Sequence, residues 1–241
     1  MRKQTYDLIV SLGGNCAVAN QLLFRDMRPF SLPLDYVFMV DYAPIKYLQE
    51  AFKNRFEKFC LKENLVELVG EERADDRSGN IQYKDTYSGF RFIHHFPKPI
   101  EQGGVFDATK ETLNRRIERL FAKIDKRKKI LFVLNTNFAF DVQLAIELKN
   151  VIAGKWKNKK ITFLVIQFGA EEDKTLNIKK FGTLVLHKRK MHEKDFFRNQ
   201  LPEWQIFNYI KLNQFDNIFD KYKFKIWSHL GKELKRKSYI K

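Results

Sequence analysis

The feature that most constrains the fold is a strand, helix, strand pattern in the second half of the chain. An apolar run at 130–134 is followed by a polar loop, a helical apolar pattern at 142–151 and, after a basic turn, a second apolar run at 161–166. Such a pattern is typical of a βαβ unit with parallel strands. A strand at 6–12 and another at 183–186 fit the same sheet. The sequence therefore predicts an α/β fold, a three-layer sandwich with a mainly parallel central sheet flanked by helices.

Two further helices are expected between these halves of the chain. One is capped by Asp41 and carries an apolar stripe of Ile45, Leu48, Phe52, Phe56, Phe59 and Cys60. The other begins near Asp107 and buries Leu113, Ile117, Leu120, Phe121 and Ile124. The polar stretch 69–88 is expected to be a loop region, and 90–93 a short strand.

The length of 241 residues favours one domain. We expect one α/β domain over 1–200, with 201–241 as an aromatic and then basic helical extension of it. With only two cysteines and no C-x-x-C pair, a disulfide scaffold or structural metal site is not expected, which favours a reducing, cytoplasmic compartment. The apolar runs are far below the roughly 18 residues of a membrane span, and no targeting segment is recognised.

The net charge of +16 raises affinity for polyanions in general without selecting one. The basic residues are spread along the chain and accompany no zinc finger, RNP-type or helix-turn-helix signature, so no specific nucleic acid partner is expected. The sequence also lacks a Gly-x-Gly-x-x-Gly or Gly-Lys-Ser/Thr loop, which disfavours dinucleotide chemistry and nucleotide hydrolysis.

Cys16 is the strongest candidate for a reactive group. It follows Gly13, Gly14 and Asn15 at the point where a strand turns into a helix. Ligands and catalytic groups gather at that edge of a parallel sheet, and the start of a helix favours a thiolate. The two glycines allow close backbone approach, so nearby N–H groups could hold an oxyanion. The alternative is a small apolar side chain that packs the start of the helix.

A nucleophilic cysteine needs a base and polar partners. His94 and His95 end the strand at 90–93, and strand alternation should turn one inward and the other outward; His187, His192 and His229 lie in basic surroundings. Asp35, in an aromatic-flanked loop after the first helix, must pair with a backbone N–H, a helix start, an arginine or the histidine if it is buried. Asn135 and Asn137 follow the strand at 130–134, and each could donate to an oxyanion, orient a histidine or cap the next helix.

Three of these segments, in this order, resemble a bacterial family of unknown function that is described as papain-like cysteine peptidases. They are 7–16, which ends in Leu-Gly-Gly-Asn-Cys, then 29–36, and then Phe-Ile-His-His-Phe at 92–96. The resemblance covers roughly residues 5–170. It implies Cys16 as nucleophile, His94 as base and Asp35 as polar partner. His95 stands where the family commonly has Asp, which leaves open which histidine acts as base.

The resemblance and the residues together favour a thiol-dependent acyl-transfer enzyme, a cysteine hydrolase acting on a small-molecule, glycan or peptide acyl substrate without a cofactor. The strand and Gly-x-Asn-Cys helix start are also similar to acyltransferases that use a Cys/His pair with coenzyme A. The first alternative is therefore a coenzyme A-dependent acetyltransferase of surface polysaccharide. The second is a non-catalytic module that binds a polyanion or glycan. The sequence leaves the oligomeric state open.

Overall fold

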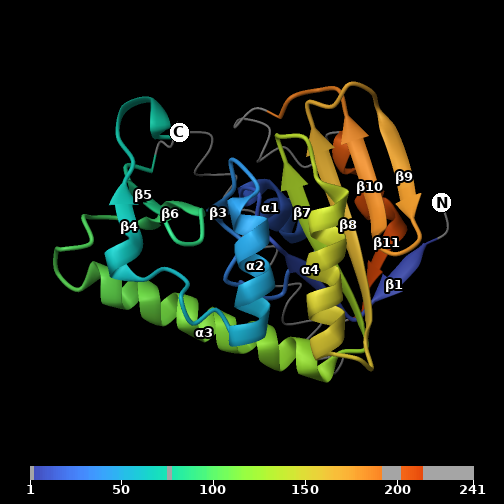
Figure 1. Ribbon diagram of the computed structural model, residues 1–241, viewed down its shortest axis with the longest axis horizontal. Helices are drawn as coiled ribbons and strands as arrows, with labels where there is room; N and C mark the ends of the chain where they lie inside the picture. Colours follow the sequence, from blue (N-terminus) through green and yellow to red (C-terminus); the bar gives the residue numbers. More distant parts are fainter. Residues whose placement is uncertain (1–2, 75–77, 192–201, 214–241) are drawn as a thin grey trace.

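The computed structural model describes residues 3–74, 78–191 and 202–213 (Figure 1). The strands are β1 (Gln4–Tyr6), β2 (Leu8–Ser11), β3 (Val37–Phe38), β4 (Leu65–Glu67), β5 (Ile81–Asp85), β6 (Arg91–Phe96), β7 (Lys129–Thr136), β8 (Lys160–Phe168), β9 (Lys174–Ile178), β10 (Gly182–His187) and β11 (Ile210–Leu212). The α-helices are α1 (Cys16–Phe24), α2 (Ala43–Asn54), α3 (Val105–Lys126) and α4 (Val142–Lys155). Short 3-10 helices are η1 (Lys62–Asn64), η2 (Gly70–Glu72) and η4 (Pro202–Tyr209).

The largest sheet has five strands in the order β2-β7-β8-β10-β9. The β2–β7, β7–β8 and β8–β10 pairs are parallel, and only the edge pair β10–β9 is antiparallel. The predicted βαβ unit is β7, α4 and β8, and the strands expected at 6–12 and 183–186 lie in the same sheet as β2 and β10. Asp7 separates β1 from β2 because its carboxylate accepts hydrogen bonds from the N–H groups of Lys128 and Lys129.

Alternate residues of the central strands pack into two different apolar clusters. Leu8, Ile130 and Phe132 belong to the cluster that contains the buried residues of α2, α3 and α4. Ile9 and Leu131 belong to the second cluster, which also contains four residues of α1 and two of η4: Cys16, Ala17, Val18, Leu22, Trp204 and Phe207. This alternation is what strand geometry requires when both faces of a sheet are covered. In Figure 1, α2 and α4 lie in front of the sheet and α1 lies behind it.

The protein contains a second sheet in addition to the five-stranded one. It has four antiparallel strands in the order β3-β6-β5-β4. The mixed α/β fold is confirmed, but the predicted single central sheet leaves out this second sheet. The expectation of a loop over 69–88 was wrong for β5. This segment has polar side chains but forms a strand that pairs with β4 and β6. The expected strand at 90–93 is longer and includes both histidines.

The helix after Asp41 ends earlier than its apolar stripe suggests. The carboxylate of Asp41 accepts a hydrogen bond from the N–H of Ala43, as expected of a cap. The helix stops at Asn54, and the next two residues, Arg55 and Phe56, adopt left-handed backbone angles (φ 59° and 63°). The remaining residues of the stripe lie in the irregular segment after the helix, and their side chains are also buried: Phe56, Phe59 and Cys60. Helix α3 begins at Val105 and buries the five residues predicted for it.

The described part of the C-terminal region covers η4 and β11. The side chains of Trp204 and Phe207 are fully buried in the cluster on the α1 face of the sheet, and β11 pairs in parallel with β1. The basic part of the predicted extension, 214–241, lies outside the described residues. Among the helices that the structure describes, none combines the length and apolar character needed to cross a membrane.

Candidate active site

The turn between β2 and α1 is built from two glycines that no other residue could replace without strain. Gly13 and Gly14 have φ values of 91° and 101°. A methyl group on Gly14 would overlap the backbone carbonyl of Asn135 and lie 2.7 Å from its Oδ1 atom. At Gly13 it would lie 3.0 Å from a methyl of Val37. The turn is therefore wedged between the end of β7 and the start of β3, and the backbone oxygen of Gly14 accepts a hydrogen bond from the N–H of Met39 at 3.0 Å.

Cys16 is the first residue of α1, as the sequence predicts. Asn15 adopts an extended conformation, and its Oδ1 caps the helix by accepting a 2.8 Å hydrogen bond from the N–H of Ala17. The side-chain oxygen of Asn15 is thus used as a helix cap. Cys16 is only 1% exposed and packs with the apolar cluster on the α1 face. The thiol sits at the positive end of a helix but under other side chains.

Asn135 lies directly beneath this turn. It is in the last part of β7, paired in register with Ile166, and strand alternation from Leu131 and Val133 turns its side chain to the α1 face. It is fully buried, yet neither its Oδ1 nor its Nδ2 has a hydrogen-bond partner among the residues that the structure describes. A buried amide without partners loses about 1–3 kcal/mol relative to one that is hydrogen-bonded. The amide therefore has its full capacity available for a ligand at the Cys16 turn.

Neither Asn135 nor Asn137 caps the next helix. Asp141 has that role, accepting hydrogen bonds from the N–H groups of Gln143 and Leu144. The strand continues through Asn135, so this residue is too far from α4 to act as its cap. Asn137 is exposed in the bend after β7. The structure thus separates the two asparagines and brings only Asn135 to the glycine turn.

His94 and His95 lie in a bulge of β6. Ile81 pairs with Phe96 and Tyr83 with Phe92, so Gln82 alone on β5 faces three residues, 93–95, on β6. The bulge interrupts the regular pairing of β6 at this point, and both histidines are half-buried rather than one buried and one exposed. Bulges often re-aim side chains next to active sites.

The two histidines have different surroundings. The ring of His94 packs edge-on against Phe38 of β3, with 5.8 Å between ring centroids. Phe38 in turn packs against the cluster that contains Cys16. His95 packs against Phe92, and its Nδ1 is sealed without a partner in the described part of the chain. Burial, with the nearby charges of Arg116 and His94, lowers the pKa of His95 to about 3. His95 is therefore a neutral imidazole at physiological pH.

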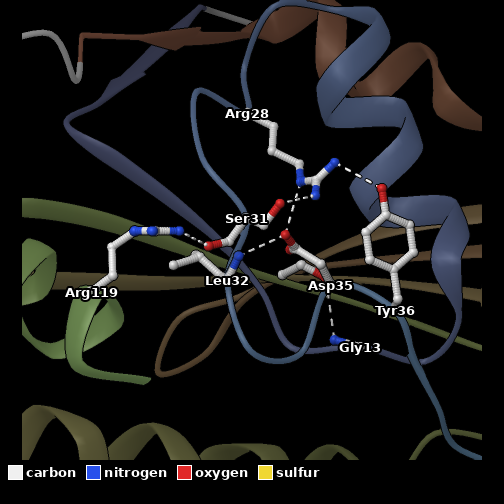
Figure 2. Close-up of polar contacts among 8 residues, drawn as sticks. Gly13, Arg28, Ser31, Leu32, Asp35, Tyr36 and Arg119 are labelled. Carbon is white, nitrogen blue, oxygen red and sulfur yellow. Dashed lines mark hydrogen bonds and ion pairs between the residues drawn. The ribbon is translucent and has the colours of Figure 1, made fainter. Parts of the chain in front are cut away.

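Asp35 is buried and paired with Arg28 (Figure 2). Its Oδ2 accepts hydrogen bonds of 2.8 Å from Nε of Arg28 and from the N–H of Leu32. The rest of the guanidinium donates to the hydroxyls of Tyr36 (2.9 Å) and Ser31 (2.8 Å). An arginine was one of the four partners expected for this carboxylate. Burial alone lowers the pKa of Arg28, but Asp35 and Tyr36 outweigh it and the net pKa is raised.

Which arginines surround Asp35 was not predicted from the sequence. Arg28 comes from the chain just after α1, and Arg119 of α3 donates from Nη1 to the backbone oxygen of Ser31 at 2.8 Å. A third, Arg116, lies one turn before Arg119 on α3. The available signal was the carboxylate between Pro33 and Tyr36, since a buried carboxylate requires a partner and an arginine is one of those expected. The sequence alone does not indicate which of the many basic residues supplies it.

The remaining titratable candidates lie away from this site or outside the described residues. Cys60 is fully buried, and burial raises the pKa of its thiol to about 12, so it is inert at neutral pH. His187 lies on β10 with Nδ1 3.5 Å from a carboxylate oxygen of Asp173. His192 and His229 fall outside the described residues. Across the residues described, no group of three or more His, Cys, Asp or Glu side chains could hold a metal ion.

Comparison with known proteins identifies the family. The family model described as "Putative papain-like cysteine peptidase (DUF1796)" matches residues 7–170, more than half of the 241-residue chain. The chain belongs to this family, which confirms the predicted resemblance. The matched range contains the glycine turn, Cys16, Asp35, both histidines of β6 and Asn135. No curated protein and no solved structure matches the chain.

Proposed function

We propose that this member of the papain-like cysteine peptidase family is a thiol-dependent acyl-transfer enzyme with Cys16 as its nucleophile. The observation that carries the proposal is the amide of Asn135, which is buried under the turn that presents Cys16 and has no hydrogen-bond partner in the described part of the chain. A purely structural turn gains nothing from an amide that is buried without hydrogen bonds. An amide whose donor is held ready at a nucleophile suits a carbonyl oxygen that becomes negatively charged during acyl transfer.

The reaction follows from the chemistry of a thiol and an imidazole. The Cys16 sulfur attacks the acyl carbonyl while its proton passes to His94, and the Nδ2–H of Asn135 donates to the developing oxyanion. The bond from the carbonyl carbon to the leaving group then breaks, and His94 returns the proton to the leaving group. Water attacks the resulting thioester, which releases a carboxylic acid and restores the thiol.

His94 is the proposed base rather than His95. A base must accept a proton during the reaction, and the surroundings of His95 oppose its protonation down to a pKa of about 3. His94 packs on Phe38, whose ring contacts the Cys16 cluster. Asp35 is proposed as a positioning residue. Together with Arg28 and Leu32 it holds the loop that leads into β3, and β3 supports both the glycine turn and His94.

The near-complete burial of Cys16 adds one requirement. A sulfur that is 1% exposed cannot meet an acyl carbonyl until neighbouring side chains move, so catalysis requires local opening on the α1 face. Local openings of this kind have free energies well below that of global unfolding.

The experiment compares Cys16→Ser with Cys60→Ser, a matched change at the other buried cysteine. Each protein is incubated with p-nitrophenyl acetate, and the acetyl adduct is located by peptide mass spectrometry while released p-nitrophenolate is followed by absorbance. We expect acetylation on Cys16, loss of turnover in Cys16→Ser and unchanged turnover in Cys60→Ser. Equal turnover in both variants, or no adduct on Cys16, would show that Cys16 is a packing residue and would favour a non-catalytic binding module.

A further inference from the structure

Arg116 lies on the side of α3 that faces the loop containing Asp35 (residues 29–36, called here the Asp35 loop). Two contacts of neighbouring residues on the helix define its position. At one end, the hydroxyl of Thr109 donates to the backbone oxygen of His95 at 3.2 Å. At the other, Arg119 donates to the backbone oxygen of Ser31 at 2.8 Å. A helix turns about 100° per residue, so Arg116 lies within about 20° of the direction of Thr109 and about 60° of that of Arg119. Its side chain therefore projects between β6 and the Asp35 loop.

This place contains more positive charge than its carboxylate can balance. Asp35 is the acidic group that the surroundings of Arg116 provide, and its Oδ2 already accepts from Arg28 and from a backbone N–H. Burial lowers the pKa of Arg116, Asp35 raises it, and Arg28 and Arg119 lower it again, so the net pKa is lowered. Within the described residues, the Arg116 guanidinium forms no hydrogen bond or ion pair. One carboxylate thus stands among three guanidinium groups.

The two acidic residues of α3 that are nearest to Arg116 in the sequence do not supply the missing negative charge. Glu111 and Glu118 are exposed and point to the opposite side of the helix, about 140° and 160° away from Arg116. Glu118 is paired with Arg55. Two turns further along the Arg116 side of the helix, Lys123 adds another cation, with its ammonium 5.2 Å from the centre of the Phe30 ring.

We propose that Arg116, with Arg28 and Arg119 beside it, forms a binding site for an oxyanion, the phosphate or carboxylate group of a ligand. A guanidinium has a planar fork of donors that matches the paired oxygens of such groups. Arg28 and Arg119 are held by protein oxygens, which leaves Arg116 as the group that contacts the ligand. Its half-buried position strengthens that contact, because a charge pair away from bulk water is less screened.

The site adjoins the Cys16 turn without depending on its chemistry. The hydroxyl of Tyr36 accepts a hydrogen bond from Arg28 and its ring packs against the cluster that contains Cys16. These contacts connect the arginine cluster to the apolar cluster that contains Cys16. The inference itself concerns binding alone, and it stands whether or not Cys16 is catalytic.

The test uses inorganic phosphate and acetate as probes, with chloride at matched ionic strength as the reference, and measures affinity by calorimetry on the full chain. Arg116→Gln is compared with Arg115→Gln, an exposed neighbour on α3 whose loss changes the net charge equally. We expect Arg116→Gln to weaken binding at least tenfold and Arg115→Gln to change it less than twofold. The preferred probe identifies the ligand group: tighter phosphate binding indicates a phosphoryl group, and acetate binding of equal or greater strength indicates a carboxylate.

Two results would overturn the proposal. One is equal binding by Arg116→Gln and Arg115→Gln, and the other is an effect of chloride as large as that of either probe. Cys16→Ser should bind the probe as the unmodified protein does, so a failure of the thiol chemistry and a failure of the anion site give different outcomes. Arg119→Gln serves as a second variant and should weaken binding without loss of the fold, because its side chain is half-buried.

Discussion

Replacing Asp35 by Asn should strongly destabilise the protein. The Asp35 and Arg28 side chains are 2% and 9% exposed. The variant keeps the shape of the side chain but leaves the Arg28 guanidinium buried without a counter-charge and close to Arg116. Removing one partner of a buried pair typically costs about 3–5 kcal/mol. In a chain of this length each kcal/mol corresponds to about 2–4 °C, so the melting temperature should fall by about 6–20 °C.

A matched control comes from an exposed pair. Arg55 and Glu118 also form an arginine–carboxylate contact, but their side chains are 48% and 69% exposed. Glu118→Gln should therefore change the free energy of unfolding by less than about 1 kcal/mol. Both variants are measured by urea unfolding at pH 7, followed by tryptophan fluorescence. The double variant Arg28→Met, Asp35→Asn should recover part of the stability, because no buried charge is then left unpaired.

The outcome also decides the role of Asp35. If Asp35→Asn costs no more than Glu118→Gln, the argument that Asp35 neutralises a buried arginine is refuted. If in addition the variant has lost acylation of Cys16, Asp35 acts in the reaction rather than in positioning the loop. Loss of stability with acylation retained in the folded fraction is what the structure predicts.

Three other changes test the surroundings of Cys16. Asn135→Leu, which is similar in shape, should leave the free energy of unfolding unchanged or raise it by about 1 kcal/mol, because it removes two buried polar atoms that have no partner among the described residues. Acetylation of Cys16 should be lost in this variant, and loss of the fold instead would contradict our interpretation. Gly14→Ala should prevent folding or lower the free energy of unfolding by on the order of several kcal/mol, because the added methyl group overlaps Asn135. Thermal unfolding measures this effect, with Gly154→Ala as the control, since a methyl group there meets open space. The pKa of His95 is about 3 in the fold against an ordinary value near 6.5, so protonation favours the unfolded chain. The contribution of His95 to the free energy of unfolding is complete above pH 6.5. The free energy of unfolding should then decline by about 1.4 kcal/mol per pH unit as the pH falls from 6.5 towards 3. His95→Phe should show a shallower acid dependence in urea unfolding between pH 7 and 5, and an unchanged dependence would contradict the burial of a neutral imidazole.

The parts of the fold that the sequence predicted are those with a strong local pattern. The apolar runs of β7 and β8 and the 3.6-residue stripe of α3 gave the βαβ unit and the long helix. The strand β5 was missed because its five residues, Ile81–Asp85, include a charged residue at two positions. Its stability comes from pairing with β4 and β6, which are not adjacent to one another in the sequence. Such pairing leaves little trace in local composition.

The site was predicted in its types of residue but only partly in its geometry. The glycine turn and the helix start at Cys16 follow from local sequence, since Gly-Gly-Asn before an apolar helix has few other uses. The arrangement of His94 and His95 depends on a bulge against β5, which no local pattern reveals. The arginines of α3 lie near Asp35 only because the helix packs against the loop that contains it, as the hydrogen bond from Arg119 to Ser31 shows, so their placement depends on tertiary structure.

The most direct test of the account is the rate at which each cysteine is alkylated in the native protein. Cys16 and Cys60 are buried to 1% and 0% exposure, so a packing role for both predicts equal protection. Our account predicts that iodoacetamide at pH 7 labels Cys16 through local opening, at least tenfold faster than Cys60, as followed by peptide mass spectrometry. Equal rates, with both thiols reacting only when the whole protein unfolds, would contradict the claim that Cys16 is a nucleophile.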